Sequence, residues 1–80
     1  MKIVYETKDW IEASLLVTFE FQMVGMAKTN GVCYFKFDKP EDANVVLDKY
    51  RKDQLDISAR KFVDSQRRIK DLIFNAPVRR

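Results

Sequence analysis

The stretch "NGVCYFKFDKPEDANVVLDKY", Asn30 to Tyr50, decides the fold, because a turn signal, a strand and a helix start follow one another in it. Asn30 and Gly31 tolerate the positive φ of a type I′ turn, so the flanking segments are expected to pair as an antiparallel hairpin. One face of the following strand is apolar, with Cys33, Phe35 and Phe37. The other face is mixed, with Val32, Tyr34 and Lys36. We expect the first face to pack on helices and the second to look outward.

The strand leads directly into "KPEDANVVLDKYRKD", residues 39–53, which carries the signals of a helix N-terminus. Pro40 suits the first helical position, and the helix dipole favours the negative charges of Glu41 and Asp42 in the first turn. Four apolar residues then follow at i, i+3, i+4 and i+7, namely Ala43, Val46, Leu47 and Tyr50. This spacing predicts a helix with one buried stripe.

On the N-terminal side of the hairpin, the sequence predicts a strand, a helix and a second strand. "KIVYE", residues 2–6, has strand composition. A helix is predicted over about residues 8–19, with Thr7 or Asp9 as its N-cap and with Glu12 at capping-box spacing from Asp9. The first strand of the hairpin is predicted within residues 21–29, where Gly25 indicates a bulge or an edge position.

On the C-terminal side, "SARKFVDSQRRIKDLIFN", residues 58–75, predicts a helix with Ser58 as N-cap. Its buried side is expected to hold Phe62, Ile69, Leu72 and Ile73. "QLDI", residues 54–57, is either a short closing strand or a link. Pro77 ends the helix, so we expect one domain over residues 1–76 and a basic tail over residues 77–80.

The order of these elements predicts the α+β class. Helices that cover one face of a small antiparallel sheet bury its apolar side most simply. The expected arrangement is the split β-α-β-β-α(-β) order of ferredoxin-like and RNA-recognition folds, with an extra C-terminal helix.

The composition of the chain excludes several classes of function. Apolar runs stay well short of the roughly 18 residues that indicate a membrane span, and no secretion signal opens the sequence. One cysteine and no histidine exclude an intramolecular disulfide and a multi-cysteine zinc site. We therefore expect a cytoplasmic protein with no metal, no cofactor and no membrane contact. Catalysis is not expected either, because no histidine is present and both glycines have turn or bulge roles.

Charge is unevenly distributed along the 80 residues. The net charge is +3, and all of the positive excess lies after residue 57, where seven Lys and Arg face two Asp. Four cations of the last predicted helix fall within about a third of its circumference, namely Arg60, Lys61, Arg67 and Arg68. They are candidate phosphate contacts, together with Arg79 and Arg80. Asp64 and Asp71 share this side of the helix, so internal ion pairs are the alternative interpretation.

"NGVCYFKF" resembles the third-strand motif of RNA-recognition domains, and "DKPEDANVVLDKY" is similar to the turn and second helix of that family. In this resemblance Asn30 takes the basic position, and Val32 and Tyr34 take the two stacking positions. It implies that Tyr34 and Lys36 form part of an outward sheet surface for RNA or single-stranded DNA.

A second resemblance covers more of the chain. "YETKDWIEASLLV", "TNGVCYFKFD" and "ISARKFVDSQRRIKDLIFN" resemble a small uncharacterised domain family carried by bacteriophages and prophages. Its motifs are a leading "Y-x-T-x-D", an "NG" hairpin and a final helix of "F…K-x-x-I-[YF]-N" type. They are carried here by Tyr5, Thr7, Asp9, Asn30, Gly31, Phe62, Lys70, Ile73, Phe74 and Asn75. The resemblance implies a mobile-element origin and no named activity.

Together these patterns predict a small non-catalytic module that binds nucleic acid. The candidate contacts are Tyr34, Lys36, Arg60, Lys61, Arg67, Arg68, Arg79 and Arg80. The alternative is a protein-interaction module that binds or inhibits a host or defence complex. A variant of that alternative self-associates as a structural phage component.

Overall fold

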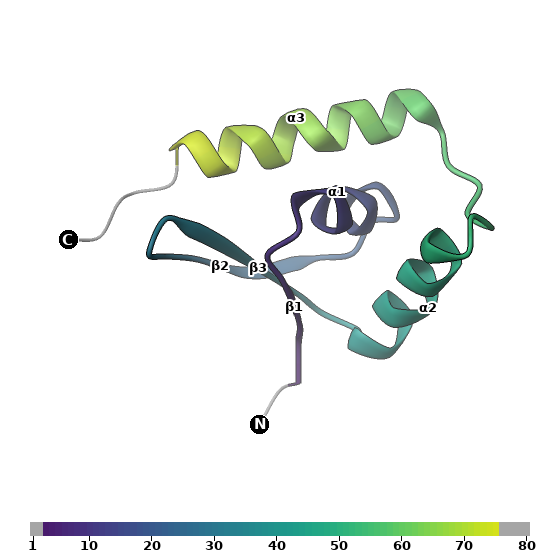
Figure 1. Ribbon diagram of the computed structural model, residues 1–80, viewed down its shortest axis with the longest axis horizontal. Coiled ribbons are helices and arrows are strands. Elements are labelled where there is room, and N and C mark those ends of the chain that lie inside the picture. Colours follow the sequence, from purple (N-terminus) through teal and green to yellow (C-terminus); the bar gives the residue numbers. More distant parts are fainter. Residues whose placement is uncertain (1–2, 76–80) are drawn as a thin grey trace.

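The computed structural model describes the backbone of residues 3–75. In chain order its elements are β1 (Tyr5–Thr7), α1 (Trp10–Thr18), β2 (Met23–Thr29), β3 (Val32–Phe37), α2 (Pro40–Arg51) and α3 (Ala59–Asn75) (Figure 1). The strands form one antiparallel sheet in the order β1-β3-β2. The predicted α+β class, with an antiparallel sheet and three helices, is confirmed.

The β2–β3 hairpin has the predicted turn. Thr29 pairs with Val32, which leaves Asn30 (φ 52°) and Gly31 (φ 80°) as a two-residue loop. A Cβ atom on Gly31 would meet no heavy atom within 4 Å, so the position favours glycine for its backbone conformation and not for space. The pairing register shifts between Met23 and Gly25, and this irregularity is the bulge that the glycine indicated.

The inner face of the sheet is the centre of the core. Cys33, Phe35 and Phe37 of β3 are buried, the two phenylalanines completely. All three helices contribute buried residues to the same cluster: Ala13, Leu15 and Leu16 from α1, Ala43 and Leu47 from α2, and Ile69 from α3. The apolar face of β3 therefore forms one core with buried residues from all three helices.

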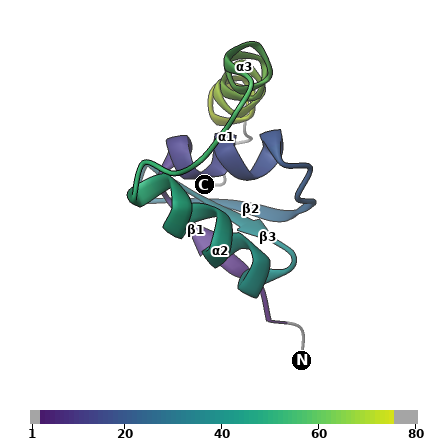
Figure 2. The ribbon, with the colours of Figure 1, turned by 90° about the vertical axis from the view of Figure 1, so that its right-hand side faces the viewer.

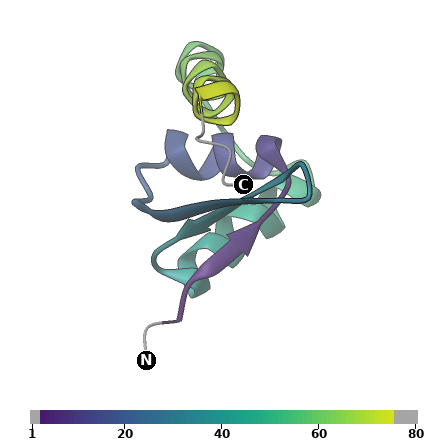
Figure 3. The same ribbon diagram turned by 90° about the vertical axis from the view of Figure 1, so that its left-hand side faces the viewer.

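Helix α3 forms a third layer. It crosses α1 on the side away from the sheet, as Figures 2 and 3 show from two directions. At this crossing the hydroxyl oxygens of Thr18 and Ser65 lie 2.8 Å apart, and Ser65 also donates to the carbonyl of Lys61 at 3.0 Å. Ile69 supplies the apolar part of the contact. The exposed side of α3 is consequently separated from the sheet by the thickness of α1.

The structure corrects the N-terminal boundaries. Strand β1 begins at Tyr5 and not at residue 2, because it pairs only with the last part of β3, from Tyr5 opposite Phe37 to Thr7 opposite Phe35. Helix α1 begins at Trp10 because Asp9 is its N-cap, accepting from the backbone N–H of Ile11 at 2.8 Å. Thr7, the other candidate cap, lies in β1.

In the second half of the chain, one open alternative is decided and one prediction is corrected. Residues 54–57 contain no strand, so they link α2 to α3, and within residues 3–75 no fourth strand lies beside β1. Tyr50 was expected in the buried stripe of α2 but is 43% exposed. It lies in the last turn, and its ring borders a cleft beside Leu55 and Ile57 instead of entering the core.

Candidate nucleic-acid interface

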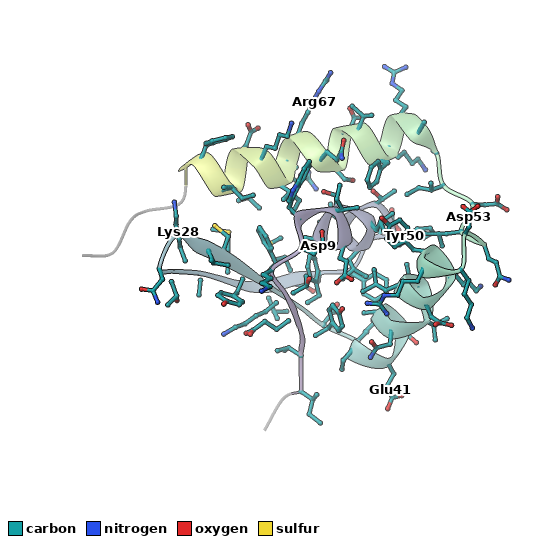
Figure 4. The ribbon with its side chains drawn as sticks, in the orientation of Figure 1. Asp9, Lys28, Glu41, Tyr50, Asp53 and Arg67 are labelled. Carbon is teal, nitrogen blue, oxygen red and sulfur yellow. The ribbon has the colours of Figure 1, made fainter. Side chains whose placement is uncertain are left out.

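The outward side of α3 carries the four cations that the sequence singled out. Arg60, Lys61, Arg67 and Arg68 are all exposed, and we call this set the α3 basic face. The opposite side of the helix packs inward through Phe62, Ser65, Ile69, Leu72 and Ile73. Ser58 caps the helix, since its hydroxyl accepts from the Lys61 N–H at 3.3 Å. Figure 4 shows the side chain of Arg67 pointing away from the body of the molecule.

The four cations of the α3 basic face form no ion pair with Asp64 or Asp71. Among the described residues three ion pairs form: Lys36 with Glu6 at 3.9 Å, Arg51 with Glu12 at 3.0 Å, and Lys52 with Asp48 at 3.0 Å. None of them involves a residue of α3. Exposed pairs at i,i+4 spacing stabilise a helix by only about 0.3–0.5 kcal/mol. A polyanion therefore meets little competition from Asp64 and Asp71.

The outer face of the sheet holds the other two candidate residues. Tyr34 and Lys36 are half-buried and alternate with the core residues of β3, as predicted. Lys36 lies opposite Glu6, and its alkyl chain passes close to Gly25, where a Cβ would come within 3.5 Å of Lys36 Cδ. The lysine thus lies across the sheet toward a carboxylate and is less available to an outside anion than the arginines of α3.

The structure does not bring these two groups together. Helix α3 lies on one side of α1 and the sheet lies on the other (Figures 1 and 2). The exposed α3 basic face and the outer face of the sheet are therefore on opposite sides of the molecule. A ligand bound along α3 therefore does not touch Tyr34 or Lys36. Arg79 and Arg80 lie outside the described residues.

Sequence reasoning gave no role to an aromatic contact at the start of α1. The ammonium of Lys70 lies 5.4 Å from the ring centroid of Trp10, a cation–π distance. Phe74, one turn further along α3, is 82% exposed. The spacing of four residues between Lys70 and Phe74 places them on one side of α3. The contact of Lys70 with Trp10 could not be predicted, because the two residues are far apart in the sequence.

The "Y-x-T-x-D" motif has a structural role. Tyr5 and Thr7 donate their hydroxyls to Glu12 Oε1 at 3.0 and 2.9 Å, and Arg51 donates to Oε2 at 3.0 Å. The N–H of Asp9 donates to the Thr7 hydroxyl at 3.0 Å. Glu12 therefore faces β1 and α2 instead of closing a capping box, because these donors hold its carboxylate. The motif joins β1 to α1.

The phenol of Tyr5 makes this cluster sensitive to alkaline pH. Burial, and then the hydrogen bond to Glu12, raise the pKa of Tyr5 above 10.0. Because the folded state keeps the proton longer than the unfolded chain, this stabilisation is complete below about pH 10 and is lost as pH rises through the folded pKa. Urea unfolding between about pH 9 and 11 should show the free energy of unfolding falling less steeply in Tyr5→Phe than in the wild type. Equal slopes would contradict the assignment.

No helix within residues 3–75 is long and apolar enough to cross a membrane. In the same part of the chain, no three His, Cys, Asp or Glu side chains gather where they could hold a metal ion.

Comparison with known proteins identifies the family of the chain but gives no function for it. A family model described as "Domain of unknown function (DUF5659)" matches residues 2–75, which include every described strand and helix. No curated protein and no solved structure matches the chain. The resemblance to an uncharacterised domain family is confirmed at this level.

Proposed function

We propose that this chain, which belongs to the DUF5659 family of unknown function, is a small non-catalytic module that binds nucleic acid, RNA or single-stranded DNA. The observation that supports the proposal is the α3 basic face. Its four cations are exposed and take no part in the ion pairs formed by the described residues. A cationic face without internal partners favours a polyanion.

The four cations of the α3 basic face lie in two rows along the helix. Arg60 and Arg67 form one row, and Lys61 and Arg68 form the other, each with a spacing of seven residues. Seven residues are two helical turns, or about 10.5 Å along the axis, so each row can reach two phosphates that are not adjacent. Each phosphate contact releases counterions, and this release gives affinity without reading the base sequence. We therefore expect weak sequence preference.

A mobile-element origin belongs to the same proposal. It is supported by the resemblance of the "Y-x-T-x-D", "NG" and final-helix motifs to a phage-borne family. The genes beside the coding sequence test it directly. Phage structural or replication genes next to it would support the origin, and a conserved set of housekeeping genes would contradict it.

Salt dependence tests the binding proposal. The chain is titrated with fluorescently labelled single-stranded RNA, single-stranded DNA and duplex, and the binding constant is measured by anisotropy over a range of salt concentrations. We expect Arg67→Ala combined with Arg68→Ala to weaken binding and to flatten the slope of log K against log salt by about 1.4, since about 0.7 is lost per phosphate contact to a single strand.

A matched control removes the same charge elsewhere. Lys49→Ala with Lys52→Ala takes two exposed cations from the end of α2 and should leave the slope at the wild-type value. Equal flattening by both double variants would mean that only net charge matters, and the α3 basic face would not be the interface. Absence of binding at low salt would remove nucleic acid as the ligand in favour of a protein partner, which was the alternative expected from the sequence.

A further inference from the structure

One edge of α3 combines cations with exposed apolar side chains. Val63, Arg67, Lys70 and Phe74 follow one another at i, i+4, i+7 and i+11, so they form a single line along the helix. Trp10 of α1 joins this line because the Lys70 ammonium lies over its ring. We call these five residues the aromatic edge. Val63 is 41%, Trp10 37% and Phe74 82% exposed, so three large apolar groups face solvent beside two cations.

The aromatic edge carries positive charge and no carboxylate of α3. At 100° per residue, Asp64 and Asp71 lie on the side of Arg67 that faces Arg68, away from Val63, Lys70 and Phe74. Lys70 takes no part in the ion pairs of the described residues, and its ammonium lies over the Trp10 ring instead. The edge is therefore complementary to a ligand that combines negative charge with flat apolar groups.

We infer that the aromatic edge binds single-stranded nucleic acid, with bases stacked on Trp10 and Phe74 and with phosphates on Arg67 and Lys70. This inference rests on the proposed function and adds the substrate class and a second set of contacts. An exposed cation–π contact is weaker than the stacking of a base on an aromatic ring. A base that stacks on Trp10 thus displaces the Lys70 ammonium, which can then contact the neighbouring phosphate.

Single strands are selected because of the aromatic side chains. In a duplex the faces of the bases are stacked on one another, and a protein reaches them only by unstacking the helix. In a single strand the faces are accessible, and stacking on them tolerates any sequence. The arginines of the α3 basic face alone would not make this distinction, since both forms carry phosphates.

Trp10 is the only tryptophan of the chain, so its fluorescence reports on the edge directly. The full chain is titrated with a single-stranded oligonucleotide of uridines or thymidines and with a duplex of equal length. We expect quenching and tighter binding with the single strand. Phe74→Leu should weaken single-strand binding by roughly fivefold to 150-fold, the range that corresponds to losing one stacked base, and should leave the salt slope unchanged. Phe74 is 82% exposed, so this variant keeps the fold.

Tyr50→Leu is the matched control, because Tyr50 is an exposed aromatic residue of α2 outside the edge. It should leave binding unchanged. The inference would be overturned by equal affinity for duplex and single strand, together with wild-type affinity in Phe74→Leu. In that case a flattened salt slope in the Arg67→Ala, Arg68→Ala variant would still support the proposed function. Quenching of Trp10 by an acidic apolar peptide and not by oligonucleotides would assign the edge to a protein partner and overturn this inference, whereas the proposed function is overturned only if anisotropy detects no oligonucleotide binding at low salt.

Discussion

Phe35→Ala is expected to lower the free energy of unfolding by about 3–5 kcal/mol. Phe35 is completely buried in the central strand, where it pairs with Thr7 of β1 on one side and Met26 of β2 on the other. Its ring lies in the cluster that collects residues from all three helices. Alanine removes this apolar surface from the core and leaves a cavity at the point where both edge strands and the helices meet.

This loss is large for so small a chain. A domain of 80 residues has a total stability of about 4–12 kcal/mol, so the variant should unfold at a much lower urea concentration than the wild type. Urea unfolding followed by circular dichroism measures the change. Val32→Ala, in the same strand but on the exposed outer face, should cost less than about 1 kcal/mol. Similar losses for the two variants would mean that the assignment of inner and outer faces is wrong.

Glu12→Ala is expected to cost about 2–3 kcal/mol, the second largest effect. The Glu12 side chain is only 14% exposed and accepts from Tyr5, Thr7 and Arg51, which come from β1 and α2. Alanine leaves two hydroxyls and a guanidinium without their acceptor. Hydrogen bonds to a charged group contribute about 1.5–3 kcal/mol. The expected loss is that of about one such bond and not of three, because the Arg51 side chain is 53% exposed and can turn to water.

Two further variants separate this effect from a general loss of charge. Glu6→Ala removes a carboxylate that is 50% exposed and 3.9 Å from Lys36, and should change stability by less than about 1 kcal/mol. A double-mutant cycle of Glu12→Ala with Arg51→Ala should show coupling, because the two residues share one contact. Additive effects, or a Glu12→Ala change no larger than that of Glu6→Ala, would show that the carboxylate does not join the three elements.

The features that could be predicted from the sequence are those that depend on neighbouring residues. The two-residue turn follows from the backbone preferences of Asn30 and Gly31, and the inner face of β3 follows from period-two alternation. The outward position of the α3 cations follows from helical periodicity. Each of these signals lies within one element, so no knowledge of the tertiary arrangement was needed.

The features that could not be predicted depend on contacts between distant segments. Glu12 had a local explanation as a capping-box residue, but its carboxylate is held by β1 and by Arg51. Tyr50 had the right spacing for burial but lies in a turn that passes the edge of the core. Similarly, no pattern showed that Tyr34 and the arginines of α3 face opposite directions, because this depends on α3 packing on α1.

The position of α3 as a third layer has a consequence for how the protein opens. The helix is attached mainly through α1, while β1, β2 and β3 hold one another by backbone hydrogen bonds. Detachment of α3 therefore breaks mainly the contact with α1 and leaves the hydrogen bonds between the strands intact, so it is one partial unfolding open to the chain. Any ligand that bridges α3 and Trp10 holds the two helices together and suppresses that opening, so binding stabilises the attachment of α3 to α1.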